Sequence, residues 1–208
     1  MWQFLSSLFK DKKHKEEQNL MKKYLIVGLG NIGEAYENTR HNIGFKVLDF
    51  FAKKEGFIFQ TQKLGDISTF KLKGRTMIFL KPNTYMNLSG KAVAFWQTKE
   101  NIPIENTLII TDDLNLPFGS LRLKTKGTHG GHNGLKDIQE KLNTTKYNRF
   151  RFGIGAVFSK GKQTDYVLGE WTNDEKIQLE ERLEKAVELV QSFVLAGVNN
   201  TMTVFNGK

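Results

Sequence analysis

Polar side chains that could perform acid–base chemistry follow three apolar runs of the sequence, at points where strands are expected to end. They are Asn31 and His41 after the run that ends at Gly28, Asn83, Tyr85 and Asn87 after residues 76–82, Asp112 and Asp113 at the end of residues 106–113, and His129, His132 and Asn133 in a glycine-rich loop. In open α/β sheets, ligands bind beyond the carboxyl ends of the strands. We therefore expect these side chains to gather at one site.

The residue types at this site predict a hydrolytic reaction. A histidine beside a carboxylate acts as a general base, because the acid fixes its tautomer and orientation. The chain has no cysteine and no G-x-S-x-G motif, so water is the nucleophile that such a base would activate. Carboxamides can stabilise an oxyanion and can also bind peptide-like groups. The combination favours direct hydrolysis of an ester or amide, although Asp112 and Asp113 at a strand end could instead cap a turn or helix.

The charge of the chain indicates a polyanionic partner. Its formal net charge is +9, and most of the excess lies between residues 24 and 172, where the polar clusters also lie. Neutralising phosphates is an effective source of affinity for a basic surface. We therefore expect a substrate that carries phosphates, with a merely basic soluble protein as the alternative.

Two other functions have weaker support. Gly28, Gly30 and Gly33 match the G-x-G-x-x-G spacing of dinucleotide-binding turns. However, residues 34–42 lack a helical period, and Asp49, at the distance of the ribose-binding acid, lies mid-helix by pattern. Glycine torsions at a strand-to-loop turn are the simpler explanation. His129 and His132 could suggest a metal site, but no third ligand is close in sequence, so we expect neither metal nor cofactor.

Hydrophobic periodicity predicts a single α/β domain, a twisted mixed β-sheet with helices on both faces. The expected strands cover residues 23–29, 67–73, 76–82, 106–113, 120–127 and 149–156. The expected helices cover residues 42–56, 89–100, 134–143 and 172–197. Ser89 is the expected N-cap of the second helix, and Thr172 or Asn173 that of the last.

The first 20 residues differ in pattern from the rest of the chain. Residues 1–20 combine a short apolar cluster with a charge run, which predicts a disordered or weakly helical extension before a domain over residues 21–208. A weak membrane anchor or a partner-binding tail stays open for this segment, as does Met21 as an alternative start. No stretch is apolar enough to span a bilayer, and zero cysteines fit a reducing compartment.

Four motifs in order resemble those of the bacterial-type peptidyl-tRNA hydrolases, over residues 23 to about 205. They are LIVGLGNIGEAYENTRHNIGF, LKPNTYMNLSGKAV, DDLNLPFGSLRLKTKGTHGGHNGLKDI and YNRFRFGIG. The resemblance implies a phosphorylase/hydrolase-like fold and a cytoplasmic, monomeric enzyme without metal or cofactor. It also implies the reaction: hydrolysis of the ester between a peptide and the 3′ ribose of tRNA, which recycles peptidyl-tRNA from stalled translation. The alternative is a non-catalytic RNA-binding relative, which would be expected to have lost the histidine or the aspartate.

The resemblance also implies roles for residues of the catalytic group. His41 matches the general base and Asp112 the acid that orients it. Asn31 and Asn87 match the carboxamides that place the peptidyl part and stabilise the transition state. Tyr85 and Met86 lie beside them.

Further positions match substrate-binding residues of the family. Asn133 matches an asparagine that helps to place water and substrate, and Tyr36 a tyrosine near the terminal nucleotide. Lys124 and Arg151 match basic residues that bind acceptor-stem phosphates; as alternating strand residues, each can face outward, and ordinary solvated charges are the alternative. The chain departs from the family pattern at three positions outside the catalytic group, namely Ile32 in place of proline, Asn115 in place of an acid, and Thr128 within a glycine run.

Overall fold

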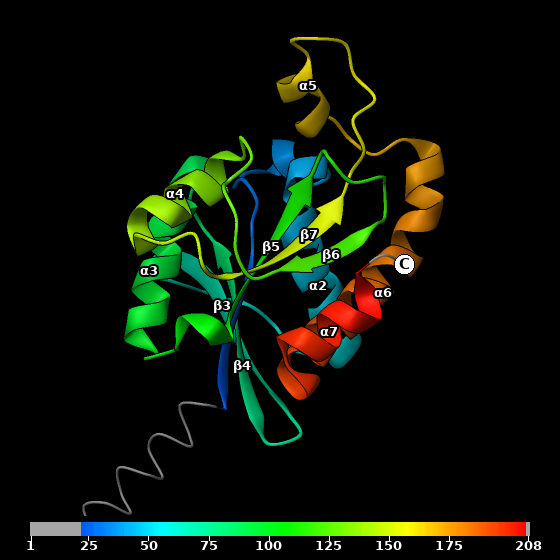
Figure 1. Ribbon diagram of the computed structural model, residues 1–208. Coiled ribbons are helices and arrows are strands. Elements are labelled where there is room, and N and C mark those ends of the chain that lie inside the picture. The colour runs from blue at the N-terminus through cyan, green and yellow to red at the C-terminus, as the bar shows by residue number, and fades with distance from the viewer. Residues whose placement is uncertain (1–21, 207–208) are drawn as a thin grey trace, which may run out of the picture.

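A seven-stranded mixed sheet forms the centre of the protein (Figure 1). The computed structural model describes residues 22–206. The strand order is β2-β3-β4-β1-β5-β7-β6, in which β4, β1, β5 and β7 run parallel while β3 and β6 pair antiparallel with their neighbours β4 and β7. The strands are β1 (Lys23–Gly28), β2 (Gln60–Gln62), β3 (Gly65–Leu72), β4 (Arg75–Pro82), β5 (Thr107–Asp113), β6 (Leu121–Lys124) and β7 (Asn148–Gly153).

Helices cover both faces of this sheet, which confirms the expected fold class. The helices are α2 (Ile43–Glu55), α3 (Ser89–Lys99), α4 (Asn133–Leu142), α5 (Gln163–Val167), α6 (Asn173–Ala196) and α7 (Val198–Phe205), with 3₁₀ turns η1 (Glu34–Tyr36), η2 (Arg40–Asn42), η3 (Met86–Leu88) and η4 (Ile104–Asn106). Alternate residues of β1 enter two separate cores: Ile26 packs with α2 and α6, whereas Leu25 and Val27 pack with α3 and α4.

Four elements, α7, α5, β2 and β6, differ from the expected pattern. The chain after Gly197 forms α7, a separate helix, because Gly197 has a φ of 82° that ends α6. The helix α5 and the short edge strand β2 were not predicted, since each has five residues or fewer and no clear period. The strand expected over residues 120–127 is shorter, because the chain turns into the loop that leads to α4.

The cap predictions were right for α6 and wrong for α3. Thr172 caps α6 in a capping box with Glu175. Ser89 does not cap α3: it is the first helical residue, and its hydroxyl donates to the carbonyl of Met86. The amide of Gly90 instead donates to the Asp137 carboxylate of α4, over 2.6 Å, so a neighbouring helix supplies the cap.

The glycines after β1 allow close packing more than unusual torsions. A Cβ on Gly28 would lie 2.2 Å from the carbonyl oxygen of Gly44, and one on Gly30 would lie 2.7 Å from the Phe45 ring. Of the three motif glycines, Gly33 alone has a positive φ, 104°. The expectation that the turn needs torsions favoured by glycine thus holds at Gly33 alone. Gly28 and Gly30 instead let the start of α2 approach the end of β1.

The predicted extension over residues 1–20 lies outside the described residues. Among residues 22–206, no helix is both long and apolar enough to cross a bilayer.

Candidate active site

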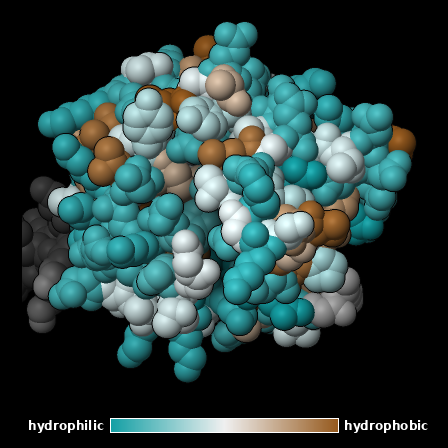
Figure 2. Space-filling model, turned by 90° about the horizontal axis from the view of Figure 1, so that it is seen from above, coloured by the Kyte–Doolittle hydropathy of each residue, from teal (hydrophilic) through white to brown (hydrophobic). Residues whose placement is uncertain are grey.

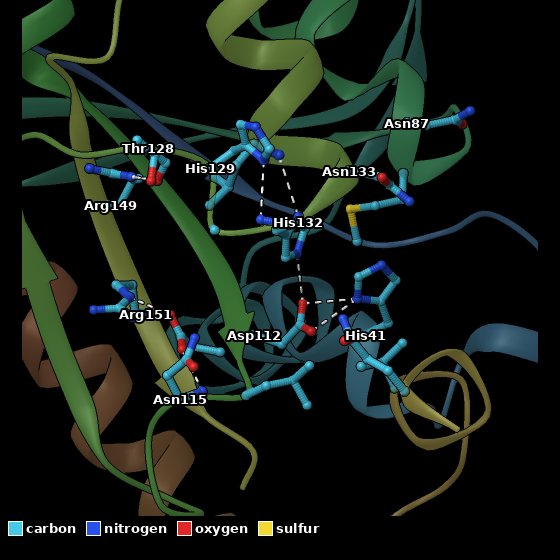
Figure 3. A pocket seen from close by; sticks show the side chains of 18 of the residues that line it. His41, Asn87, Asp112, Asn115, Thr128, His129, His132, Asn133, Arg149 and Arg151 are labelled. Carbon is cyan, nitrogen blue, oxygen red and sulfur yellow. Dashed lines mark hydrogen bonds and ion pairs between the residues drawn. The ribbon is translucent and has the colours of Figure 1, made fainter. Parts of the chain in front are cut away.

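A cleft of about 820 Å³ lies at the carboxyl ends of the parallel strands. Figure 3 shows side chains from separate elements that line it. The residues from the sequence analysis that it brings together are Asn31, His41, Tyr85, Met86, Asn87, Asp112, Asp113, Lys124, His129, His132, Asn133 and Arg151. Asn83, which was also expected at the strand ends, does not line it. Tyr36 lies on η1, half-buried, and does not line this cleft, so its contact with a nucleotide stays a prediction.

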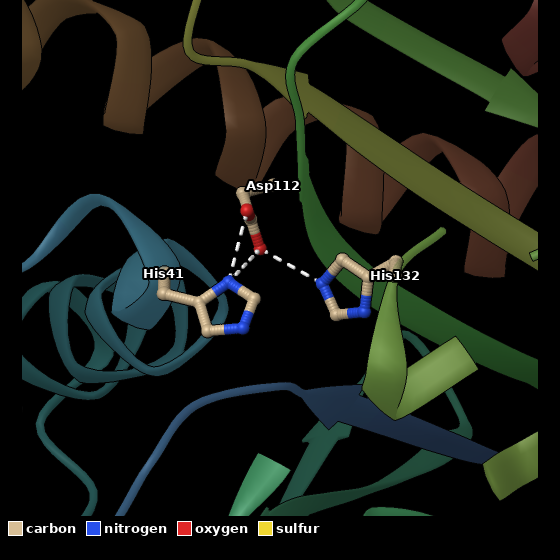
Figure 4. Close-up of side chains that lie close together, drawn as sticks. All are labelled: His41, Asp112 and His132. Atoms are coloured by element: carbon tan, nitrogen blue, oxygen red, sulfur yellow. Dashed lines mark hydrogen bonds and ion pairs between the residues drawn. The ribbon is translucent and has the colours of Figure 1, made fainter. Parts of the chain in front are cut away.

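His41 and Asp112 form the pair that the sequence analysis expected at the strand ends. Nδ1 of His41 lies 3.0 Å from both carboxylate oxygens of Asp112. His41 belongs to the 3₁₀ turn η2, which follows the loop after β1, and Asp112 lies at the end of β5. Nδ1 therefore donates to Asp112, which leaves Nε2 as a base that faces away from the carboxylate (Figure 4).

The electrostatics of the pair keep the carboxylate charged. Burial alone would raise the pKa of Asp112, but His41 and His132 together outweigh it and hold that pKa well below its usual range. Burial alone would lower the pKa of His41, but the charge of Asp112 and its hydrogen bond raise it above 6.5. The acid thus stabilises a positive charge on His41, as a general base requires once it has taken a proton.

His132 is a second histidine on Asp112, and sequence reasoning did not place it there. Its Nε2 lies 2.9 Å from Oδ1 of Asp112 and 2.7 Å from the Thr111 hydroxyl. Its Nδ1 accepts the amides of Gly134 and Leu135, so the ring is the N-cap of α4. Because Nδ1 must present its lone pair to these amides, Nε2 carries the proton and donates it to Asp112.

The tautomer of His132 also bears on metal binding. His41, Asp112 and His132 form a compact group of donor atoms, all within 4.8 Å of one another, with the composition of a zinc site. A metal on Nε2 of a neutral His132 would require the proton on Nδ1, which faces two amide N–H groups. The residues therefore fit a hydrogen-bonded acid with two histidine donors better than a metal centre.

Asn42 holds the loop that carries Asn31. Its Oδ1 accepts the Asn31 amide at 2.8 Å, and its Nδ2 donates to the Asn31 carbonyl at 2.9 Å. Oδ1 of Asn31 accepts the amide of Met86 at 2.8 Å, so the side-chain NH₂ of Asn31 is the group that can donate to a ligand. Asn42 fixes the backbone of Asn31, and Met86 fixes its side chain.

Replacing Asn42 by alanine is expected to destabilise the fold, because it removes both atoms of Asn42 that bond Asn31 in a buried place. Leaving a buried polar group unpaired costs about 1–3 kcal/mol. Urea unfolding monitored by circular dichroism measures the effect. Asn38→Ala, at an exposed position of the same loop, is the control and is expected to leave the midpoint nearly unchanged. Equal midpoints for Asn42→Ala and Asn38→Ala would contradict the role of Asn42.

The other carboxamides lie on different walls of the cleft. Asn133 is the first residue of α4, and Asn87 belongs to η3, the 3₁₀ turn before α3. Met86 is buried beneath them, whereas Tyr85 is 56% exposed. Figure 3 shows Asn87 at the edge of the cleft, apart from the Asp112–His41 pair. A ligand that bridges Asn87 and His41 must therefore extend along the cleft.

The sheet face over β6 and β7 carries four cationic residues. Lys124 pairs with Arg149 and Arg122 with Arg151 across the antiparallel ladder, so each pair faces the same side. Arg151 forms an ion pair with Asp113 of β5, and Arg149, only 3% exposed, donates to the carbonyl of Thr128. Burial lowers the pKa of Arg149. The prediction that Lys124 faces outward is confirmed, whereas Arg151 is partly buried because Asp113 draws it in.

Like charges directly opposite in a ladder are destabilising. Two such pairs beside each other, with one acid among them, mark a surface that gains from an anionic partner. Figure 2 looks onto the end of the molecule that carries α5 and shows a mainly hydrophilic surface with separate apolar patches. This composition suits a charged ligand more than an apolar one.

Comparisons with known proteins agree on one family. The family model described as peptidyl-tRNA hydrolase matches residues 25–208. A peptidyl-tRNA hydrolase of Azobacteroides pseudotrichonymphae is 58% identical over 184 residues, which cover 88% of this chain and 99% of the relative. One of Phocaeicola vulgatus is 56% identical over 186 residues, covering 89% of this chain and 100% of the relative. The crystal structure of peptidyl-tRNA hydrolase from Acinetobacter baumannii superposes with a TM-score of 0.84 at 35% identity, covering 90% of this chain and 96% of that one.

Proposed function

The chain belongs to the peptidyl-tRNA hydrolase family, and we propose that His41 is the general base with which it hydrolyses its ester substrate. The observation that carries this proposal is the 3.0 Å contact of His41 Nδ1 with Asp112, which leaves Nε2 facing away from the acid. The substrate is peptidyl-tRNA, in which an ester joins the peptide to the 3′ ribose.

Nε2 of His41 removes a proton from a water molecule as its oxygen attacks the ester carbonyl. The imidazolium that results is stabilised by the Asp112 carboxylate, which His132 holds in place from the other side. Collapse of the tetrahedral intermediate breaks the bond to the ribose oxygen, which takes the proton back from His41. No covalent enzyme intermediate is needed, because the attacking oxygen comes from water.

The carboxamides bind the peptidyl side of the ester. The NH₂ group of Asn31, held by Met86, can donate to the developing oxyanion or to a peptide carbonyl. Asn87 and Asn133 stand along the cleft, where the peptide's own amide groups can pair with them. A free aminoacyl ester lacks these amide partners, which would leave polar groups of the site unpaired and so disfavour it.

The phosphates of the tRNA lie along the cationic face of β6 and β7. Lys124 forms none of the ion pairs found among residues 22–206 and is exposed at the edge of the cleft, so its charge is free for a phosphate. Arg151 contributes its guanidinium from beside Asp113. Charge neutralisation of this kind supplies affinity with little sequence preference.

Replacing Lys124 by alanine is expected to weaken tRNA binding and to reduce its salt dependence. The slope of log K against log salt should fall by about 0.9 for each phosphate that the variant no longer neutralises. Binding of a tRNA without an aminoacyl group, measured at several salt concentrations, gives this slope. Lys53→Ala, an equal change of charge at the exposed C-terminal end of α2, is the control and is expected to keep the wild-type slope. The role of Lys124 in phosphate binding would be refuted if Lys124→Ala kept it as well.

The activity is tested most simply with one tRNA in two forms. The protein is expected to release an N-acetylated amino acid from tRNA and to act far more slowly on the same tRNA with a free amino group. Similar rates on both forms would contradict recognition of the peptide amide, and no release of the acetylated amino acid would favour a non-catalytic RNA-binding protein.

The proposal also covers the oligomeric state, the need for a metal or cofactor, and the location of the protein. We extend the proposal to a monomer that needs neither metal nor cofactor, as the resemblance of its motifs implies. The substrate is a product of translation, which favours a cytoplasmic location. Activity that survives dialysis against a chelator, and a sedimentation mass of one chain, are the expected results.

A further inference from the structure

A covering segment, residues 155–171, stands over the carboxyl ends of the strands and forms one wall of the cleft. It includes α5, which Figure 1 shows above the sheet and apart from the other helices. The residues of this segment that line the cleft are Ala156, Phe158, Gln163, Thr164, Val167 and Leu168. None of them belongs to the catalytic group described above, so a connection between the segment and His41 must come from other residues.

Arg40, the residue before His41, makes this connection. It is only 5% exposed, and its guanidinium carbon lies 4.4 Å from the centre of the Tyr166 ring. Its backbone amide donates to the carbonyl of Gly169 at 3.1 Å, and its Nη1 donates to the carbonyl of Tyr166 at 3.3 Å. Thr39 adds an isolated β-bridge to Glu170. The turn that carries His41 is thus bonded directly to the covering segment.

The other end of the guanidinium reaches the start of α6. Nη2 of Arg40 lies 2.7 Å from Oε2 of Glu175, and the two side chains are 7% and 13% exposed. The same oxygen accepts the backbone amide of Thr172 at 2.7 Å within the capping box. One carboxylate oxygen therefore joins the catalytic turn, the end of the covering segment and the first turn of α6.

A buried ion pair of this kind contributes little to stability, because the cost of removing both charges from water offsets their attraction. Its effect is to impose one geometry, since a guanidinium forms directional bonds to several acceptors at once. Arg40 is bonded to both the covering segment and α6, and His41 is the next residue on the same 3₁₀ turn. This route connects the covering segment to the residue next to His41 in the chain.

We propose that Arg40 is a positioning residue, which uses its ion pair with Glu175 to set the covering segment and the His41 ring in one arrangement. This inference rests on the proposed role of His41 as the base. It assigns a function in the reaction to two residues, Arg40 and Glu175, that do not line the cleft.

The test compares two variants at the start of α6. Glu175→Gln removes the charge that pairs with Arg40 but keeps an acceptor for Thr172, since glutamine also completes a capping box. Thr172→Ala removes the capping hydroxyl and leaves the Arg40–Glu175 pair. Glu175→Gln is expected to lower kcat by about 10–100-fold with KM nearly unchanged, because a small misplacement of a catalytic group has effects of this size. Thr172→Ala is expected to lower Tm and keep kcat.

A double variant tests whether Arg40 and Glu175 act together. Arg40→Gln combined with Glu175→Gln is expected to be no slower than Arg40→Gln alone, because the first change already removes the pair. Equal losses of kcat in Glu175→Gln and Thr172→Ala, full kcat in Glu175→Gln, or fully additive losses in the double variant would each overturn the inference. These outcomes presuppose an active wild type; a wild-type protein without turnover would instead refute the proposed function.

Discussion

His41→Ala is expected to lower the single-turnover rate of peptidyl-tRNA hydrolysis by about 10²–10⁴-fold, the contribution of a positioned general base. The reason is that Nε2 of His41 is the basic nitrogen of the pair, while Nδ1 is occupied by Asp112. Alanine leaves water in the cleft with no group to accept its proton. The measurement is quench-flow release of an N-acetylated amino acid from tRNA with enzyme in excess.

Binding and folding serve as the controls for this variant. The cationic residues proposed to bind phosphates lie on β6 and β7, on the far side of Asp112 from His41, so tRNA affinity is expected to stay near the wild-type value. A rate within a factor of a few of the wild type would refute His41 as the base. A loss of rate that is matched by an equal loss of affinity would refute it too, because His41 would then act in binding.

Asp112→Asn is expected to lower kcat by about 10³–10⁴-fold through the wrong tautomer of His41, as replacement of the orienting acid does in serine proteases. Asparagine presents one oxygen and one NH₂ group to two histidines. His132 must keep its proton on Nε2, because Nδ1 caps α4, so it takes the oxygen. The NH₂ group then faces Nδ1 of His41, which moves the His41 proton to Nε2 and removes the base.

Asp66→Asn is the matched control, since it removes the same charge from β3, away from the cleft. It is expected to keep the wild-type kcat. The NMR signals of the His41 ring report the tautomer directly, with the proton on Nδ1 in the wild type and on Nε2 in Asp112→Asn. A slow Asp112→Asn enzyme whose His41 keeps its proton on Nδ1 would contradict this explanation.

The strand ends could be predicted from the sequence because their signal is local. Apolar runs that end in Asn31, Asp112 and Asn87 identify the edge of the sheet, and the rule for ligand sites in α/β folds places them together. The two helix layers could be predicted because strand patterns alternate with helical periods along the chain. The prediction that His41 and Asp112 form a pair used these local signals, the chemistry of a histidine beside an acid, and the family resemblance.

His132 and Asn42 could not be assigned roles in the same way, because their roles depend on pairings across the fold. His132 contacts Asp112 only because its ring also caps α4, a task usually given to Ser, Thr, Asp or Asn. Asn42 resembles an ordinary polar loop residue, and its two bonds to Asn31 appear only when η2 folds back over β1. The same two bonds hold Asn31 in place next to Ile32, which is exposed.

The burial of Arg149 could not be predicted from the strand pattern. Alternation along β7 places Arg149 and Arg151 on one face, as observed, but gives no measure of depth. Both arginines line the cleft, but the loop after β6 bonds Arg149, which is buried, whereas Arg151 beside Asp113 is less deeply buried. Such differences arise from loops, whose paths the periodicity of strands does not determine.

The pH dependence of the wild-type single-turnover rate tests the central role of His41 most directly. The rate is expected to rise with pH and to level off once His41 is neutral, with a midpoint above about 6.5 because Asp112 raises the pKa of this histidine. That midpoint should equal the one obtained when the His41 ring is titrated by NMR. A rate that keeps rising in proportion to hydroxide, without a plateau at the His41 titration, would contradict general base catalysis by His41.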